Sequence, residues 1–414
     1  MSGWRIHRRS ACRICGAAAP RRVLRFERMP FTDEFVTAER RGREFVADLD
    51  VHVCETCGVV QTQHDVEIAE YYRDYTYTVS SSGFAREFMS RLAEAARRWL
   101  DLRPGDRVLE VGSGDGFQLG CFAERGLRVL GFEPSEPLVE VARRQGVDTI
   151  VGLFDRGAAN RIPADFLPVQ CVLLTYTFDH LPDPLAMLDT IRSILDPQRG
   201  VLIIEVHGLG RIVERCETCL FEHEHAIYLD RATATSVLAC GGFRVLDIEL
   251  VPEPQRRGNS LLLAATPEGA AWTADWPAAC RLPPRDPTPD LHAFARDVAA
   301  RLGGLREHVR RLRAAGRRVA GYGAGGRGVM TLAQAGLTAA DIAYLCDQNP
   351  CFHGLLTPAT HVPVAPPQRL RDDPVDEVIV FSYGYLAEIR AALADVAARG
   401  TRFVSMLDLL RGEA

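Results

Sequence analysis

The stretch CETCLFEHEHAIYL, residues 216–229, gathers side chains that can transfer protons or bind metal ions. A C-x-x-C pair is followed by an alternating run of acids and histidines: Cys216, Cys219, Glu222, His223, Glu224 and His225. A neutral imidazole can accept a proton at neutral pH, because its ordinary pKa is about 6.5. Thiolates and imidazoles are also metal ligands. The alternatives to proton transfer are therefore a metal site made by the two cysteines and two histidines, or an ordinary loop.

Four cysteines near the amino terminus predict a structural metal site. CRICG and CETCG place two C-x-x-C pairs 38 residues apart, each followed by glycine: Cys12, Cys15, Cys54 and Cys57. Four thiolates complete a tetrahedral shell around zinc and leave no open position for catalysis. The sequence therefore predicts a zinc-binding lobe.

A glycine-rich turn in the middle of the chain predicts a nucleoside cofactor. RVLEV is a predicted buried strand, and VGSGDG follows it with Gly112, Gly114 and Gly116. The next predicted strand ends in Glu133, 23 residues after Glu110. An acid at that point can bind the two ribose hydroxyls of such a cofactor.

Both NAD and S-adenosylmethionine (SAM) use sites of this kind. The acid of E-V-G-S-G-D-G comes before the first glycine, which favours SAM, and Glu110 can then engage the ammonium group of the methionine moiety. Tyr176, after the next predicted strand of the same sheet, is a further candidate cofactor contact.

Two other segments contain candidate substrate contacts. YYRDYTYTVSSSGFAREF is rich in hydroxyl groups and reads either as a strand or as a polar wall over a substrate, with Tyr75, Tyr77 and Ser81 as its main contributors. GYGAGGRG repeats the strand-to-glycine-turn pattern near the carboxyl terminus. Its backbone amides, with Tyr322, Gly323 and Arg327, can receive a diphosphate or, in an oxidoreductase, a dinucleotide.

Composition narrows the chemistry. The 414 residues carry a formal charge of −5, which gives no electrostatic reason to expect nucleic acid as a partner. All 49 basic residues are arginine, which excludes a lysine Schiff base and a P-loop lysine. The sequence contains neither an apolar run of membrane-spanning length nor a signal-peptide pattern, so a cytoplasmic location without membrane contact is expected.

Taken together, these motifs resemble the sugar C-methyltransferases of antibiotic deoxysugar biosynthesis, which act on nucleotide-linked 4-ketosugars. The resemblance runs nearly end to end, through the zinc pairs, E-V-G-S-G-D-G, G-F-E-P-S, D-H-L-P-D, H-E-H and G-Y-G-A-G-G-R-G. It implies that His225 is the base that removes the proton next to the ketone. His180 or His223 would donate a hydrogen bond to the enolate, and Glu224 would orient a histidine. Asn259, in RGNSLLL, matches a family segment near the sugar nucleotide.

The chain departs from the family at two places. Glu222 stands where the family has tyrosine, and an ionised carboxylate cannot donate a hydrogen bond to an enolate. Tyr176 and Thr177 replace family asparagines. These departures keep O- or N-methylation of a sugar or another natural-product acceptor open as the first alternative. A nicotinamide-dependent sugar oxidoreductase or epimerase is the second.

The predicted fold class is α/β, with three parts. These are a zinc-binding lobe over 1–72, a class I (Rossmann-like) SAM methyltransferase core over 73–268, and a second α/β domain over 269–414 that contributes to sugar-nucleotide binding. The predicted function is SAM-dependent C-methylation of a nucleotide-diphospho-ketosugar beside its ketone. The predicted cofactors are SAM and structural zinc, and the enzyme is expected to be a monomer or weak dimer.

Overall fold

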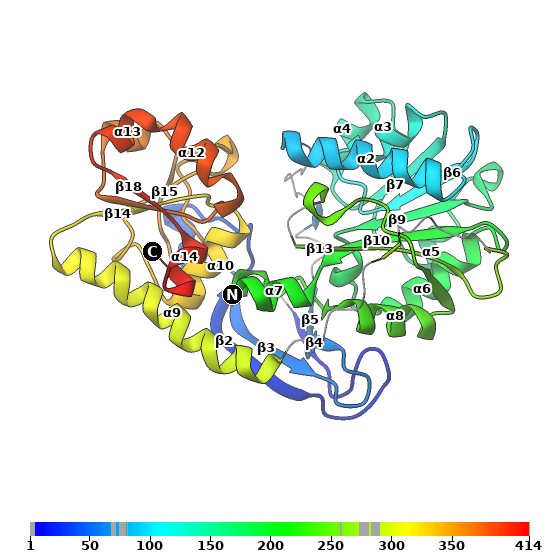
Figure 1. The fold of residues 1–414 in the computed structure, drawn as a ribbon, viewed down its shortest axis with the longest axis horizontal. Coiled ribbons are helices and arrows are strands. Elements are labelled where there is room, and N and C mark those ends of the chain that lie inside the picture. Colours follow the sequence, from blue (N-terminus) through cyan, green and yellow to red (C-terminus); the bar gives the residue numbers. More distant parts are fainter. Residues whose placement is uncertain are drawn as a thin grey trace.

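The computed structural model describes residues 5–67, 72–73, 80, 82–256, 259–272, 281–282 and 290–413. Figure 1 shows two α/β units, with the strands of an amino-terminal lobe lying below and between them. The hydroxyl-rich segment with Tyr75, Tyr77 and Ser81 lies outside the described residues.

The amino-terminal lobe is built on an antiparallel sheet. Its strand order is β11-β4-β3-β2, and the strands are β2 (Arg21–Pro30), β3 (Val46–Val53), β4 (Val60–Thr62) and β11 (Ile227–Tyr228). A separate two-stranded sheet pairs β1 (Ile6–Arg8) with β5 (His64–Val66). The fourth strand of the larger sheet therefore comes from the segment directly after the acid–histidine run.

The central unit contains a seven-stranded sheet in the order β12-β13-β10-β9-β6-β7-β8. The strands are β6 (Arg107–Val111), β7 (Arg128–Glu133), β8 (Thr149–Val151), β9 (Cys171–Thr175), β10 (Val201–His207), β12 (Phe243–Leu246) and β13 (Ser260–Pro267). Only β13 runs antiparallel to its neighbours. The predicted strands RVLEV and RVLGFE are confirmed as β6 and β7. The strand order reverses at β6, because β7 and β9 lie on opposite sides of it, and its carboxyl end therefore opens a crevice for a ligand.

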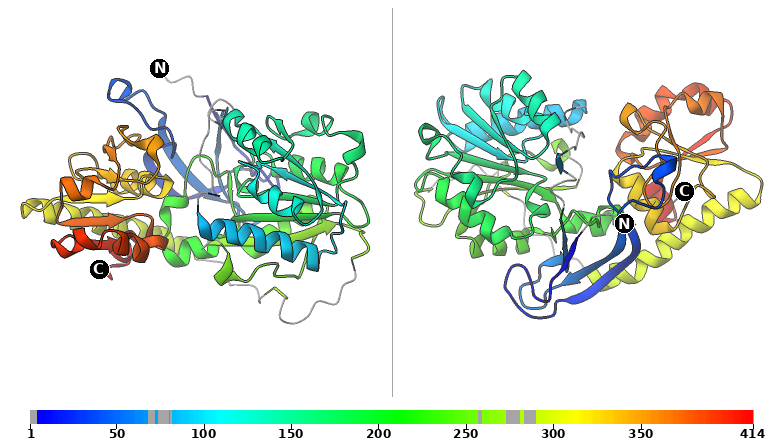
Figure 2. Two further views of the ribbon diagram at one scale, coloured as in Figure 1. Left: turned by 90° about the horizontal axis from the view of Figure 1, so that it is seen from above. Right: turned by 180° about the vertical axis from the view of Figure 1, so that it is seen from behind.

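Helices cover both faces of this sheet (Figures 1 and 2). They are α2 (Gly83–Trp99), α3 (Phe117–Ala123), α4 (Glu136–Arg144), α5 (Arg156–Ala159), α6 (Pro184–Ile194) and α8 (Arg231–Cys240), whereas α7 (Leu209–Arg215) packs toward the lobe and the carboxyl-terminal unit. The first three share one hydrophobic cluster with the sheet, and α5, α6 and α8 share another. Side-chain caps fix several helix starts; for example, Ser135 accepts a hydrogen bond from Leu138 N.

The carboxyl-terminal unit is a second doubly wound domain. Its parallel sheet has the order β16-β15-β14-β17-β18, with β14 (Val319–Tyr322), β15 (Leu345–Cys346), β16 (Val364–Ala365), β17 (Glu377–Val380) and β18 (Arg402–Ser405). Its helices are α9 (Leu291–Ala314), α10 (Gly326–Ala335), α11 (Arg369–Asp372), α12 (Leu386–Ala392), α13 (Ala394–Ala398) and α14 (Met406–Arg411). Asp290 caps the long helix α9 by accepting hydrogen bonds from His292 N and Ala293 N.

The segment 209–228 ties the three parts together. One hydrophobic cluster joins residues of β2, α7, α9 and α10, including Phe26, Ile212, Phe221, Leu305 and Met330. Gln334 Nε2 on α10 also donates to Thr218 O at 2.8 Å. The acid–histidine run is therefore held from the lobe, the core and the carboxyl-terminal domain at once. Among the described residues, no helix is both long and apolar enough to cross a membrane.

Candidate functional site

The four amino-terminal cysteines lie in one tetrahedral group. Their sulfur atoms all lie within 4.8 Å of one another, with Cys12 Sγ 3.7 Å from Cys57 Sγ and Cys15 Sγ 3.5 Å from Cys54 Sγ. Zinc–sulfur bonds of about 2.3 Å at tetrahedral angles require sulfur–sulfur distances of about 3.8 Å. The geometry therefore fits zinc with only small adjustments.

Hydrogen-bond donors around these sulfurs favour bound thiolates. Gln61 Nε2 donates to Cys12 Sγ at 3.0 Å, and Ile14 N donates to the same atom at 3.4 Å. Burial opposes ionisation of Cys12, but these donors and the Cys15 amide lower its pKa to about 7. No position remains for a substrate among four protein ligands, so the site is structural.

The central glycine turn has the conformation that a close cofactor approach requires. Gly112 lies at φ +72°, and a side chain there would meet Thr177 Oγ1 at 2.5 Å. Gly114 and Gly116 also have positive φ, and the space that a Cβ would occupy at Gly114 is open. Glu110 is buried beneath the turn and accepts a hydrogen bond from Thr175 Oγ1 at 2.8 Å.

Glu133 lies beside this turn at the end of β7. One carboxylate oxygen accepts from Gly114 N at 2.8 Å, and the other accepts from Ser135 N at 2.9 Å. Burial raises the pKa of Glu133, while the two backbone donors act in the opposite direction. The carboxylate is thus held rigidly at the crevice, where it retains lone pairs for two ribose hydroxyls.

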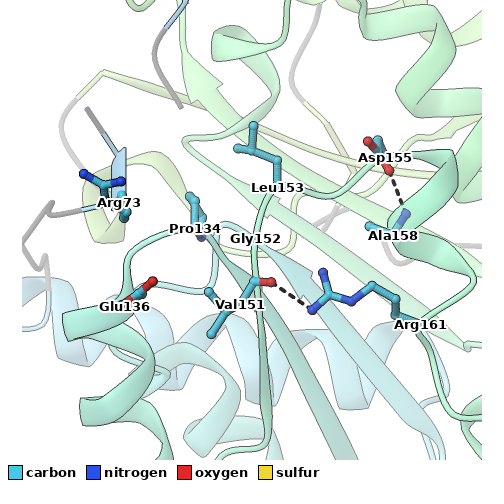
Figure 3. Close-up of a pocket in the computed structure, with 9 residues that line it drawn as sticks. All are labelled: Arg73, Pro134, Glu136, Val151, Gly152, Leu153, Asp155, Ala158 and Arg161. Carbon is cyan, nitrogen blue, oxygen red and sulfur yellow. Dashed lines mark hydrogen bonds between the residues drawn. The ribbon is translucent and has the colours of Figure 1, made fainter. Parts of the chain in front are cut away.

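A cavity of about 550 Å³ is lined by Pro134, which directly follows Glu133, and by Val151 and Leu153 (Figure 3). Figure 3 shows Pro134 and Leu153 at this cavity, with Arg161 donating to Val151 O at 2.9 Å along its side. Leu153 is 52% exposed, so its apolar side chain is open to a ligand in this cavity. An apolar wall next to a ribose-binding acid fits an adenine ring, so the residues present fit SAM.

We expect Glu133→Ala to weaken SAM binding by about 1–3 kcal/mol, roughly 5- to 150-fold, because the ribose hydroxyls lose their acceptor. Calorimetric titration measures the change directly. Glu140→Ala, at an exposed position of α4, is the matched control and should leave the affinity unchanged. Equal SAM affinity of the two variants would reject this site.

His225 lies at the carboxyl edge of the same sheet. Its Nδ1 donates to Leu220 O at 2.8 Å, which leaves Nε2 as the proton acceptor. Its ring centroid lies 4.8 Å from that of His180, which follows β9, and 5.1 Å from that of His207, which ends β10. Burial, together with the charge of His180, lowers the pKa of His225 to about 3. The imidazole is therefore neutral at physiological pH.

The structure brings His180 into this group but not His223. His180 Nδ1 shares a hydrogen bond with Tyr72 Oη at 2.9 Å. By contrast, His223 is buried in the amino-terminal lobe, where it bonds to His64 Nε2 at 2.8 Å and to Met29 O at 3.1 Å. The predicted role of His223 at the enolate does not agree with this position, because the side chains of His223 and His225 point to different sides of the loop.

Glu224 and Glu222 also have different surroundings. Glu224 Oε1 accepts from Thr32 N and from Thr32 Oγ1, at 3.5 and 3.3 Å. Glu222 lies on the His225 side, with Oε1 3.7 Å from His225 Nδ1. Burial, followed by the charges of Glu224 and other acids, raises the pKa of Glu222 well above its usual range, against the opposing charge of Arg327. Burial therefore favours the neutral, protonated form of Glu222.

The alternative metal site of the 216–225 stretch is wrong. Cys216 and Cys219 are buried in the hydrophobic cluster shared with α9 and α10, and they do not form a ligand group with His223 or His225. Burial raises the pKa of Cys219 to about 12, so this thiol stays protonated. The C-x-x-C pair serves packing here.

The carboxyl-terminal glycine turn approaches the acid–histidine run. Gly323 lies at φ +99°, and a side chain there would clash with Ser382. The guanidinium of Arg327, at the start of α10, lies 5.1 Å from the ring centre of Tyr383. Tyr322 Oη accepts from Gln348 Nε2 at 3.3 Å. Asn259 has a less direct part in this site, because its side-chain Nδ2 donates to the buried carboxylate of Glu217 at 2.7 Å.

Sequence reasoning missed three acids or histidines at strand ends. Asp179 and His207 lie beside His225, and the sequence signal for them was a polar residue at or shortly after the end of a buried strand.

Asp347, after β15, accepts from Ala324 N at 2.7 Å and from Asn349 N at 2.8 Å. This repeats the arrangement of Glu133, so the second α/β unit has the same acid-and-glycine-turn architecture as the first. Tyr176 follows β9, and its ring centroid lies 4.5 Å from that of His207.

Comparison with family models gives three successive matches. Residues 12–72 match a family described as "Putative zinc binding domain", residues 82–248 match "Methyltransferase domain", and residues 287–407 match "C-methyltransferase C-terminal domain". Together with the crevice at Glu133, these matches define a SAM-dependent methyltransferase with a class I core. Its cofactors are SAM and a structural zinc ion.

Known proteins are similar to this chain over different lengths. The C-methyltransferase NovU of Streptomyces niveus is 27% identical over 400 residues, which cover 95% of this chain and 94% of NovU. The chain is therefore similar to a C-methyltransferase over nearly its whole length, with the three matched domains in order. A ubiquinone biosynthesis O-methyltransferase of Xanthomonas campestris is 28% identical over 146 residues, 28% of this chain and 60% of that protein. The PH0226 protein of Pyrococcus horikoshii matches 48% of this chain and 99% of its own, with a TM-score of 0.37 and 20% identity. The oxidoreductase alternative for the carboxyl-terminal turn has no support from these matches.

Proposed function

We propose that this enzyme methylates the carbon beside the ketone of a nucleotide-diphospho-ketosugar, in the biosynthesis of a deoxysugar for an antibiotic. The observation that carries the proposal is the position of the 222–225 segment. His225 lies at the strand edge that also carries the SAM crevice, and Glu222 experiences the charge of Arg327 from the carboxyl-terminal glycine turn. A donor crevice, a base and a phosphate-binding turn therefore converge.

His225 supplies the base in this proposal. Its Nδ1–H is fixed on Leu220 O, so the Nε2 lone pair faces away from the backbone and can take the proton from carbon. The electron pair of that C–H bond moves into an enolate, which then attacks as a carbanion. When bound, SAM supplies an electrophilic methyl group.

A protonated Glu222 can take the role of the tyrosine that the family has at this position. A protonated carboxyl group donates a hydrogen bond as a phenol does, and a donor on the enolate oxygen stabilises the developing charge. His180 is the other candidate donor, because it lies next to His225 and is one-quarter exposed.

The carboxyl-terminal turn is proposed to bind the diphosphate. Arg327 and the backbone amides that begin α10 face the side of the molecule that carries Glu222. Tyr322 and Gly323 shape this turn, and Asn259 holds Glu217, which also accepts from Tyr383 Oη beneath Arg327. Tyr75, Tyr77 and Ser81 remain predicted substrate contacts outside the described residues.

The decisive experiment incubates the enzyme with SAM and a panel of nucleotide-diphospho-4-ketosugars in deuterated water. The expected result is a product heavier by one methyl group, with deuterium exchange at the same carbon when SAM is absent. Methylation without loss of any carbon-bound hydrogen would show an O- or N-methyltransferase instead.

Glu222 variants test its protonated state. Glu222→Gln keeps a neutral hydrogen-bond donor and should retain activity at neutral pH, whereas Glu222→Ala should lose roughly 10²- to 10³-fold in kcat. The wild-type rate should fall at alkaline pH as the raised pKa of Glu222 is passed, and Glu222→Gln should not show that fall. Glu222→Tyr should also retain activity on a ketosugar. Loss of the native reaction in both Gln and Tyr variants would mean that Glu222 recognises a different acceptor.

A further inference from the structure

A buried carboxylate surrounded by imidazoles lies next to His225. Asp179 is 3% exposed, and its Oδ2 lies 3.3 Å from His207 Nδ1. Its other oxygen, Oδ1, lies 3.9 Å from His180 Nε2 and has no hydrogen-bond partner among the described residues. The backbone carbonyl of Asp179 accepts from Ala226 N at 2.7 Å, which fixes the loop immediately after His225.

The ionisable side chains that face this carboxylate are imidazoles. In the part of the chain that the structure describes, both ion-pair partners of Asp179 are histidines, and none is an arginine. A buried carboxylate is costly without a nearby positive charge. The charge of Asp179 therefore stabilises the protonated form of a neighbouring imidazole.

His225 lies close enough to Asp179 for the carboxylate to stabilise its protonated form. One ring nitrogen of His225, one of His207 and one carboxylate oxygen of Asp179 all lie within 4.8 Å of one another. An opposite charge at about this distance changes the basicity of a group by about 1–3 pKa units. The effect acts against burial, which by itself makes His225 a weak base.

The other charged or titratable groups around His225 do not supply this charge. His180 faces it from the segment after β9 and opposes a second positive charge. Tyr228 on β11 lies 5.9 Å from it between ring centres, and burial keeps its phenol neutral by raising its pKa. Glu222 lies on the same loop as His225, and burial raises its pKa and so favours its neutral form, while the charge of Arg327 reaches that loop from α10.

We propose that Asp179 is the positioning residue that balances the charge of His225 during proton abstraction, with His207 holding the carboxylate in place. The inference rests on the proposed function. In the step, the C–H bond breaks, its electron pair forms the enolate, and the proton binds Nε2 of His225. The new imidazolium then lies beside the Asp179 carboxylate, which keeps its own charge. No oxidant, reductant or further reactant is needed.

Asp179→Asn removes the charge and keeps the shape, so it is the primary test. We expect kcat and solvent deuterium exchange to fall roughly 10- to 10³-fold with little change in KM, because the base becomes weaker. The isotope effect with substrate deuterated at the reacting carbon should rise, since proton abstraction becomes more rate-limiting. Asp189→Asn, at an exposed position of α6 paired with surface arginines, should behave as wild type.

A double variant separates this role from a structural one. If Asp179 acts through His225, adding Asp179→Asn to His225→Ala should cause no further loss of exchange. A further loss, or a wild-type exchange rate in Asp179→Asn alone, would overturn the inference while leaving the proposed function intact. A second metal equivalent in the wild type that Asp179→Asn removes would also overturn it. Methylation by the wild type without any carbon-bound exchange would instead reject the proposed function and, with it, this inference.

Discussion

His225→Ala should abolish turnover while leaving both binding sites intact. The imidazole is the group whose free nitrogen can take the substrate proton, since its other nitrogen is fixed on Leu220 O. Loss of a positioned base typically costs 10²- to 10⁴-fold in rate, so kcat and deuterium exchange should both fall by roughly this factor. SAM affinity should be unchanged, because Glu133 and the glycine turn lie on other elements.

The matched control is His353→Ala, at a partly buried position in the carboxyl-terminal domain, where the ring contacts Asp347 O. It should keep deuterium exchange at the wild-type rate. Cys219→Ser should also keep its exchange, because Cys219 is a packing residue here. Exchange at the wild-type rate in His225→Ala would show that another group, such as His180, removes the proton.

Cys54→Ser should remove the zinc ion and unfold the amino-terminal lobe. Cys54 is 1% exposed, and its sulfur lies 3.5 Å from that of Cys15 in the four-cysteine group. Structural zinc contributes about 10–16 kcal/mol of binding free energy in small zinc-dependent folds, so the variant should lose most of the stability of this lobe. Metal analysis should find one zinc per wild-type chain and none in the variant, whose melting temperature should fall sharply.

Cys351→Ser is the control for a thiol change without metal loss, because Cys351 is exposed and lies outside the four-cysteine group. It should keep one zinc and the wild-type melting temperature. A Cys54→Ser protein with unchanged zinc content would reject the predicted ligand set. Unchanged melting after complete zinc removal would reject its structural role.

The backbone of the SAM site could be predicted because its signals are local. A buried strand, three glycines and a second strand ending in an acid are contiguous in the sequence, and each glycine has a conformational reason. The zinc pairs are equally explicit, since two short turns carry all four ligands. Such sites depend on spacing that remains nearly constant when the chain folds.

The surroundings of His225 could not be predicted in the same way. Asp179 and His207 come from the ends of two neighbouring strands, and only the sheet order places them beside His225. The raised pKa of Glu222 depends on burial and on acids from other segments, including Asp33 of the lobe. His223 illustrates the opposite error: a motif member adjacent in sequence faces a different core.

Strand β11 has a consequence for how the chain folds during its synthesis. It completes the lobe sheet by pairing Ile227 with Gln61 and Tyr228 with Val60. More than 160 residues separate these partners, so the edge of β4 has no neighbour on that side until the ribosome has released residue 228. The amino-terminal segment therefore cannot be removed or exchanged without strand β11. A fragment ending near residue 72 would expose a strand edge, and recombination between relatives would have to transfer 227–228 together with the zinc-binding segment.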